Sequence, residues 1–308
     1  MRRALVLVAV GCACAPSFDD EPWRVTEPRV LAIRSEPAEA RPGERVELTL
    51  LIAAPAGTAD SRAELGFCLA PRTLAERNAV SASCLDGASP ALRSIPLAAA
   101  AEIPRAACAR FGPDAPPSEP GQPPLRPMDP DPTGGYFVPV RAVLGATDRL
   151  AFGLVRLRCA LPGAPGEIVS EFLERYTPNA NPVIATIGAS SLAGGERDPE
   201  TLGPISAGSV LDLRLRWEAG AAERYPVYDP ALVRLVDHTE SIRASWYASA
   251  GELAGDRAGK SEDEAALGER EVVSRWTAPL APGPVWLWAV LRDGRGGVSW
   301  RQIVIEVR

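Results

Sequence analysis

Lysine, histidine and methionine are almost absent from this chain of 308 residues, which contains one lysine, one histidine and two methionines. Positive charge therefore comes nearly all from arginine, and the arginines are scattered singly along the sequence. Surfaces that bind nucleic acid need a basic face, and this chain has a formal net charge of −6. The composition thus argues against a nucleic-acid partner.

The single histidine, His238, limits the acid–base chemistry that the sequence offers. Asp237 and Glu240 flank it closely and could orient an imidazole that acts as a general base. No nucleophile motif of the form Gly-x-Ser-x-Gly accompanies it. A histidine on the surface or between strands is the simpler interpretation, so we predict a protein that is not an enzyme and needs no cofactor.

Phosphate and metal motifs are also incomplete. Gly255–Ser261 resembles a phosphate-binding loop, but three residues separate its glycines where four are required. We interpret it as part of a charged loop over 251–270. Asp129, Asp131 and Asp293 could offer oxygen to calcium, yet none lies in a dense run of carboxylates. Asp-Gly is a favoured hairpin pair, which accounts for Asp293. No CxxC pair supports zinc, and we predict no metal site.

Long apolar runs are missing, and the only marked one is short and N-terminal. Two arginines precede an apolar segment over residues 4–11, which is the pattern of a secretory signal and is well short of the ~20 residues of a membrane span. The segment Ala9-Val-Gly-Cys12 resembles the lipobox of bacterial lipoproteins. That resemblance implies a signal peptide over 1–11, diacylglycerol on Cys12 and a tether over 12–28. The alternative is an ordinary secretory signal.

Export makes the remaining cysteines candidates for disulfides. Cys68, Cys84, Cys108 and Cys159 would lie in an oxidising compartment, where four cysteines most often form two bridges in one of three pairings. We favour Cys68–Cys84 with Cys108–Cys159, because the first two are close in sequence and would hold a single loop.

Glycine and proline are abundant, at 27 and 31 residues, which favours short strands joined by turns. Residues 45–52 alternate apolar and polar side chains, as a half-buried antiparallel strand does. The insertion 112–132 contains nine prolines and cannot pair centrally in a sheet. It would form a surface loop, which either has no binding role or docks a partner as an extended segment. The apolar spacing of Glu167–Tyr176 predicts a short helix.

A repeated pattern indicates duplication. Gly43–Leu50 and Gly208–Leu215 share the spacing Gly-x-x-apolar-acid-Leu-x-Leu, and each follows a similar apolar strand. The separation is too long for a solenoid unit and suits two domains. We predict an all-β fold of two tandem immunoglobulin-like antiparallel sandwiches joined near 176–182. The first would cover 29–176 with its proline-rich insertion, and the second 177–308.

Three segments of the second half resemble the PKD and immunoglobulin-like modules of bacteria: Trp246–Glu252, Trp276–Pro279 and Val290–Val298. The whole layout also resembles uncharacterised lipoproteins of high-GC Gram-negative bacteria. These resemblances imply a β-sandwich held at the outer membrane, in the periplasm or on the cell surface. Such modules serve as spacers, adhesion domains and accessory domains.

Trp286 and Trp288 are the sharpest candidate for a ligand site, because residues two apart share one face of a strand. Two such rings could stack on sugars, or they could pack on the first domain or under Trp300. The opposite face already carries a full core stripe, formed by Val285, Leu287, Ala289 and Leu291.

We therefore expect a lipid-anchored, extracytoplasmic protein of the cell envelope that binds a partner or acts as a spacer, and that is not an enzyme. One alternative is a carbohydrate-binding or adhesion module, with a glycan or an envelope protein as partner. Another is a hydrolase in the first domain, whose cleft would gather carboxylates such as Glu64, Asp86 and Asp148.

Overall fold

The computed structural model describes residues 21–58, 63–70, 80–89, 92–95, 100–112, 135–145, 149–161, 163–191 and 194–308. Regular structure in these residues is mostly β, which confirms the all-β sandwich expectation. None of the helices found there is long and apolar enough to cross a membrane. Cys12, the proline-rich stretch 113–132 with Asp129 and Asp131, and Asp148 lie outside the described residues.

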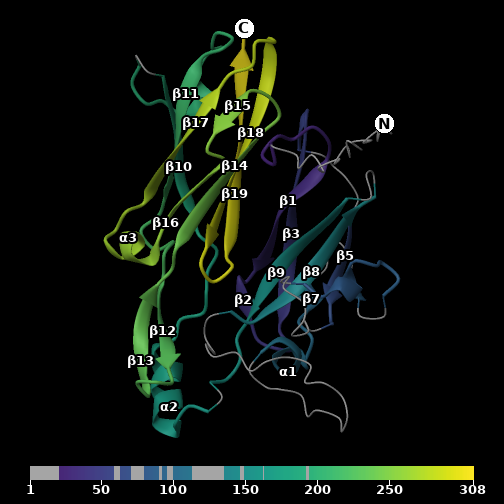
Figure 1. The fold of residues 1–308 in the computed structure, drawn as a ribbon, viewed down its shortest axis with the longest axis vertical. Helices are drawn as coiled ribbons and strands as arrows, with labels where there is room; N and C mark the ends of the chain where they lie inside the picture. The colour runs from purple at the N-terminus through teal and green to yellow at the C-terminus, as the bar shows by residue number, and fades with distance from the viewer. Residues whose placement is uncertain are drawn as a thin grey trace, which may run out of the picture.

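The strands before residue 158 form two sheets, which we call the N-terminal sandwich (Figure 1). One sheet has the order β1-β3-β4 with β7 also paired to β3, and its strands are β1 (Arg29–Glu36), β3 (Arg45–Ala54), β4 (Gly57–Thr58) and β7 (Ala101–Glu102). The other has the order β2-β9-β8-β5-β6, and its strands are β2 (Glu39–Ala40), β9 (Leu150–Leu157), β8 (Phe137–Leu144), β5 (Ala63–Cys68) and β6 (Leu92–Ile95). Among the described strands of these two sheets, β2 and β9 pair in parallel and the other pairs are antiparallel. Side chains such as Ile33, Val46, Phe67, Val140 and Val155 fill the space between the sheets.

Both disulfides favoured by the sequence are formed. Cys68 at the end of β5 bonds to Cys84 in a short 3₁₀ turn (Ala82–Cys84). Cys108 in helix α1 (Ala107–Phe111) bonds to Cys159, two residues after β9. Each bond closes a loop between elements of the N-terminal sandwich, so each restricts the unfolded chain there.

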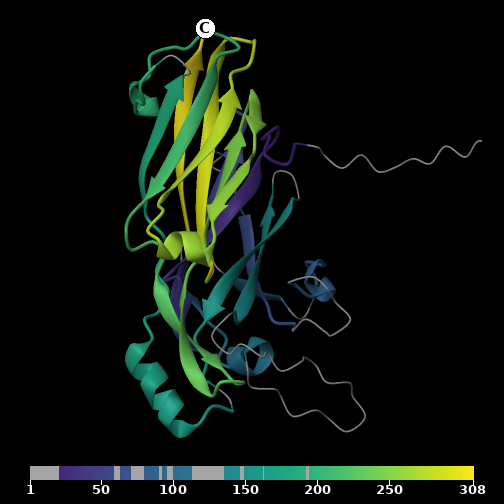
Figure 2. The same ribbon diagram turned by 60° about the vertical axis from the view of Figure 1, so that its left-hand side comes forward.

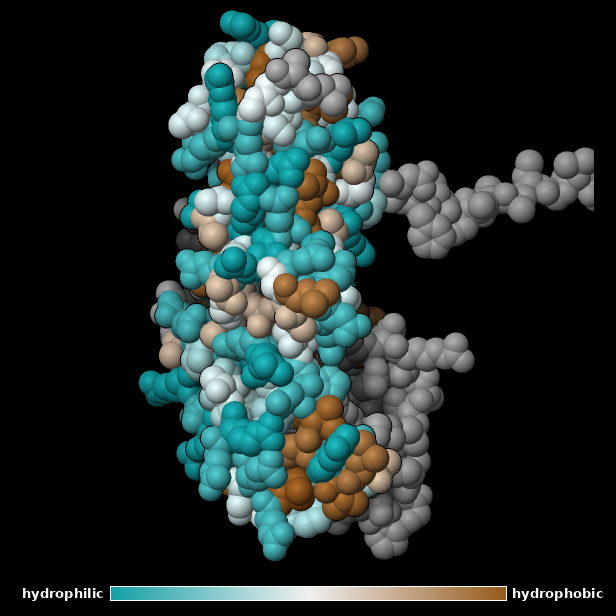
Figure 3. Space-filling view, turned by 90° about the vertical axis from the view of Figure 1, so that its left-hand side faces the viewer, coloured by the Kyte–Doolittle hydropathy of each residue, from teal (hydrophilic) through white to brown (hydrophobic). Residues whose placement is uncertain are grey.

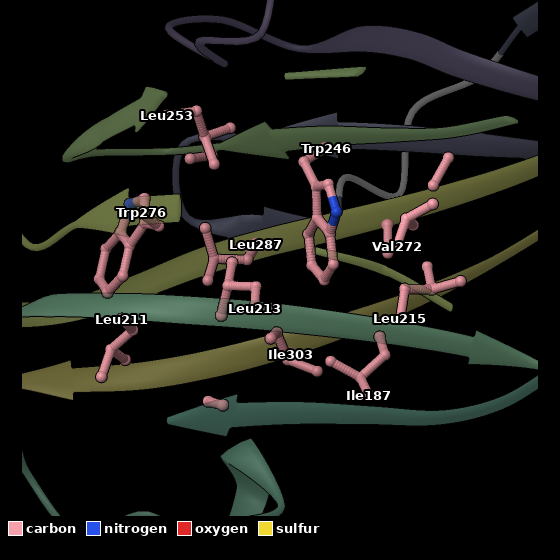
Figure 4. Close-up of a cluster of buried hydrophobic side chains, with 14 of the residues drawn as sticks. Ile187, Leu211, Leu213, Leu215, Trp246, Leu253, Val272, Trp276, Leu287 and Ile303 are labelled. Atoms are coloured by element: carbon pink, nitrogen blue, oxygen red, sulfur yellow. The ribbon is translucent and has the colours of Figure 1, made fainter. Parts of the chain in front are cut away.

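Eight of the strands described after residue 183 form a second pair of sheets, the C-terminal sandwich. One has the order β10-β11-β17-β15, with β10 (Ile184–Ser191), β11 (Val210–Trp217), β17 (Glu271–Thr277) and β15 (Glu252–Ala254). The other has the order β16-β14-β18-β19, with β16 (Arg257–Lys260), β14 (Ile242–Ala248), β18 (Gly283–Asp293) and β19 (Val298–Val307). Figure 4 shows the core between them, where Trp246 and Trp276 lie among leucines and isoleucines such as Leu213 and Ile303.

A two-stranded ribbon and a helix extend beyond this sandwich. Strands β12 (Arg224–Asp229) and β13 (Arg234–Thr239) pair with each other, and helix α2 (Gly166–Arg175) packs against them (Figure 2). The helix agrees with the one expected over 167–176, although Phe172 is its only fully buried residue.

The sequence predicts a charged loop over 251–270, and this prediction is wrong. The stretch contains β15, β16 and helix α3 (Glu262–Ala266). A capping box between Ser261 and Glu264 starts α3 and satisfies amide groups of its first turn. Lys260 forms ion pairs with Glu264 and Glu269. Lys260 and Ser261, which made the segment resemble a phosphate-binding loop, thus contact neighbouring carboxylates and the start of α3.

The end of the expected tether is also ordered. Trp23 is 7% exposed and packs into the core of the C-terminal sandwich. The Val25 amide donates to the Ala248 carbonyl at 2.8 Å, and the Ala248 amide donates to the Trp23 carbonyl at 3.1 Å. Residues from Glu21 onward therefore attach to the end of β14 and are not a free spacer.

Candidate functional site

Strand β18 is buried on both faces, which brings the two sandwiches together. Val285, Leu287, Ala289 and Leu291 face the C-terminal core, as the sequence predicted. The alternate residues Trp288 and Val290 pack instead against the N-terminal sandwich, together with Val298 of β19. Their partners there are Leu31, Ala32, Leu51 and Ala53, and Val25 from the segment before β1 packs with them.

The same contact buries part of the face of β3 that the sequence predicted to be exposed. Its Val46 and Ile52 are buried on the predicted side, but Leu51 and Ala53 on the opposite face are buried as well. That opposite face contacts the C-terminal sandwich. The strand is half-buried only over its first part.

The two tryptophans do not form a platform for sugars. Trp288 has no exposed surface, and its indole nitrogen donates to Gln302 Oε1 at 2.9 Å. Trp286 is half-buried, and its ring lies 3.0 Å from the point that a Cβ on Gly57 would occupy. Both rings therefore belong to the contact between the sandwiches, one of the alternatives that the sequence left open.

Polar contacts border this apolar surface. The guanidinium of Arg34 on β1 lies 5.0 Å from the ring centre of Trp300 on β19, within cation–π range. Arg292 at the end of β18 donates to the Leu31 carbonyl at 2.9 Å.

The turn between β18 and β19, residues 293–297, reaches into the junction between the sandwiches. Asp293 Oδ1 accepts the amide protons of Arg295 at 2.9 Å and Gly297 at 2.8 Å, the turn role predicted for this aspartate. A Cβ on Gly296 would lie 2.8 Å from the Phe137 ring of β8. One on Gly297 would lie 2.8 Å from the Ala180 carbonyl oxygen. The glycines allow the turn to approach both neighbours.

Arg295 at the tip of this turn is completely buried. Its Nε donates to Glu240 Oε1 at 2.6 Å, and its Nη2 donates to Glu223 Oε2 at 2.5 Å. Its Nη1 donates to the Thr177 carbonyl at 3.0 Å, and the Tyr225 ring centre lies 4.6 Å from the guanidinium. One side chain thus joins the hairpin, the β12–β13 ribbon and the segment between the sandwiches.

Glu39 of β2 is the matching buried charge of the N-terminal sandwich, at 4% exposure. Its Oε2 accepts protons from the Tyr176 hydroxyl at 2.7 Å, the Asn179 amide at 3.0 Å and Arg156 Nε at 3.3 Å. Arg295 Nη1 lies 4.0 Å from the same oxygen. The ionic groups of both sandwiches therefore form one cluster.

The asparagines of the segment 176–182 hold both sides of this junction. Asn179 Nδ2 donates to Asp293 Oδ1 at 3.3 Å. Asn181 Nδ2 donates to the Ser35 carbonyl at 2.8 Å, and Asn181 Oδ1 accepts the Val298 amide proton at 2.8 Å. The sequence predicted a joint between domains here, because the segment lacks apolar periodicity. In the structure, its asparagines hydrogen-bond to residues of both sandwiches.

Acidic groups outnumber basic groups in the cluster, where Arg156 and Arg295 face four carboxyls: Glu39, Glu223, Glu240 and Asp293. Burial and, after it, the nearby charge of Asp293 raise the pKa of Glu240 to about 7. Burial likewise raises the pKa values of Glu223 and Asp293. The cluster is suited to fixing orientation and to taking up a proton.

The other predicted site residues are not gathered together. His238 is partly exposed, and its Nδ1 lies 3.0 Å from Glu262 Oε2. Glu64 lines a cleft of about 480 Å³ beside Arg141, but Asp86 is not among the lining residues, and its carboxylate accepts the Ala88 amide proton at 2.9 Å. Within the described residues, no group of three or more His, Cys, Asp and Glu side chains is placed to hold a metal ion.

No family model and no curated protein matches this chain. Among solved structures, it is similar to BspA_C_WT at 10% sequence identity and a TM-score of 0.25, over 55% of this chain and 59% of that one. It is similar to BspA_C_mut at 8% identity and a TM-score of 0.25, over 55% of this chain and 54% of that one. Dimeric latent PorU from Porphyromonas gingivalis is similar at 12% identity and a TM-score of 0.20, over 92% of this chain and 24% of that one. The chain thus spans little more than half of the first two structures.

Proposed function

We propose that this protein is a lipid-anchored, extracytoplasmic and non-enzymatic spacer of the cell envelope, built from two tandem immunoglobulin-like domains in one fixed orientation. The buried ionic cluster around Arg295 is the observation that supports it most. A rigid arm of this kind would hold a partner of the envelope at a set distance and direction from the membrane.

Rigidity follows from how much of the junction is buried. Domains of one chain move relative to each other by default, unless the contact between them is large and apolar. Here β18 is covered on its second face by the N-terminal sandwich, and Trp288 is completely enclosed. A change of orientation would also move Arg295 Nη1 away from Glu39 Oε2, which lie 4.0 Å apart, and would disturb the hydrogen bonds that both make with the segment 176–179. Such losses are costly for buried charged groups.

An extracytoplasmic location is supported by the two disulfides, because such bonds persist mainly in oxidising compartments. The lipobox resemblance at Cys12 supplies the anchor. Mass spectrometry of the full-length protein extracted from membranes tests this directly. We expect a mature N-terminus at Cys12 that carries acyl chains, and a Cys12→Ser variant without them. An unmodified Cys12 in the wild type would refute the anchor.

A further inference from the structure

A cavity of about 620 Å³ lies between α2 and three loops of the N-terminal sandwich. The loops contribute Arg41 and Pro42 before β3, Arg105 and Cys108 at the start of α1, and Arg158, Cys159 and Ala160 after β9. Helix α2 and its end contribute Phe172, Leu173 and Tyr176. Sites for small molecules commonly have volumes of this size.

The loop side of the cavity is strongly basic. Three of its lining residues are arginines and none is acidic. Within the described part of the chain, Arg41 and Arg158 form no ion pair, and Arg105 approaches Glu102 at 3.4 Å while remaining largely exposed. Guanidinium groups bind carboxylates and phosphates through paired hydrogen bonds, so this side suits an anion.

The helix side of the cavity is apolar. The ring centres of Phe172 and Tyr176 are 4.7 Å apart, and Phe172 is buried. Leu173 beside them is 66% exposed, so its apolar side chain is open to contact from the cavity. Figure 3 shows an apolar patch toward the end of the molecule where α2 lies. An apolar body could rest here without displacing any side chain.

The loop side is held together by the disulfide between Cys108 and Cys159. This bond links the segment that bears Arg105 to the one that bears Arg158. A covalent link keeps the arginines near each other before any ligand arrives, which lowers the entropy lost on binding.

We propose that this cavity binds an amphiphilic anion, whose phosphate or carboxylate group is held by Arg41, Arg105 and Arg158 while its apolar chain lies against Phe172 and Leu173. This binding site goes beyond the spacer function and does not depend on it. Its ligand would be a single-chain molecule, because the volume is too small for two long acyl chains.

Calorimetric titration of the full-length chain, kept in solution by an amphipathic polymer, tests the proposal. The probes are monododecyl phosphate, dodecanoate, inorganic phosphate, and dodecyl maltoside below its micelle concentration. We expect both amphiphilic anions to bind, at least about tenfold more tightly than inorganic phosphate, since the apolar chain gains buried area. Their affinities should fall with rising salt. Equal affinity for dodecyl maltoside, or for inorganic phosphate, would overturn the proposal.

Variants with matched controls locate the site. Arg41→Gln and Arg158→Gln should each weaken dodecyl phosphate binding by about tenfold, as expected for loss of a charge-assisted hydrogen bond. Leu173→Glu should weaken it similarly by placing a carboxylate beside the anion. The controls are Arg301→Gln, on the exposed side of β19, and Leu280→Glu, at a leucine that is 85% exposed. If the cavity variants bind as the controls do, the site lies elsewhere.

Discussion

Replacing Arg295 with methionine removes the positive charge of the junction while keeping a side chain of similar length. The change leaves Glu240, which is 1% exposed, and Glu223 without the guanidinium that they contact at 2.6 and 2.5 Å. Breaking a buried ion pair by removing one partner costs about 3–5 kcal/mol. We expect a loss in this range at pH 8, where Glu240 is ionised.

The loss should be smaller at pH 5. The pKa of Glu240 is already raised to about 7 with Arg295 present, and it rises further without the cation. At pH 5 the carboxyl is therefore protonated in the variant and carries no unpaired charge.

Guanidinium unfolding followed by tryptophan fluorescence, with the disulfides intact, measures both values. The control is Arg301→Met on the surface of β19, which should change the free energy of unfolding by less than about 0.5 kcal/mol. The reasoning is refuted if Arg295→Met costs no more than this control at pH 8.

Two further changes test parts of the same cluster. Because burial raises the pKa of Glu240 from 4.5 to about 7, the folded protein takes up a proton there that the unfolded chain has already released. The free energy of unfolding should therefore fall by about 3 kcal/mol as the pH rises from 4.5 to above 7, and Glu240→Gln should flatten this slope; an unchanged slope would assign the proton to another group. Gly297→Ala should destabilise the protein by about 1–3 kcal/mol, since its Cβ would lie 2.8 Å from the Ala180 carbonyl oxygen and closer still to Asp293. Calorimetry measures this loss against Gly195→Ala, where a Cβ meets nothing within 4 Å, and an equal effect of the two changes would contradict it.

The sequence predicted the features that local pattern controls. Alternation placed Val285 and Leu287 in a core, and their burial follows from the period of two in a strand. Cysteine spacing favoured the two disulfides that are formed. The helical spacing before residue 176 likewise matched α2.

The junction could not be predicted in the same way, because it depends on contacts between distant residues. Arg295 lies in a glycine-rich turn that is typical of solvent, yet its partners Glu240 and Glu223 are 55 and 72 residues away. One signal was present: Glu39 stands between two alanines and Arg156 between Val155 and Leu157. A charge inside an apolar run indicates a buried pair.

Two other differences have simpler causes. Trp23 follows a proline in a polar stretch, so the sequence suggested a tether, but burial of its ring outweighs the local polarity. Strand β12 was not predicted from the sequence. Its Pro226 lacks an amide donor, which argues against a central strand. It lies in a two-stranded ribbon, whose outer edge tolerates a proline.

The distance between the two sandwiches tests the central claim most directly. Glu47 on β3 and Val273 on β17 are both exposed, and each would be replaced by an unnatural amino acid whose ketone group carries a spin label. This labelling does not use cysteine, so the disulfides stay intact. Pulsed electron–electron double resonance on the full-length protein should give one narrow distribution of distances between the two labels, and this distribution should broaden in Arg295→Met. A broad or multiple distribution in the wild type would contradict a fixed orientation and, with it, the rigid spacer.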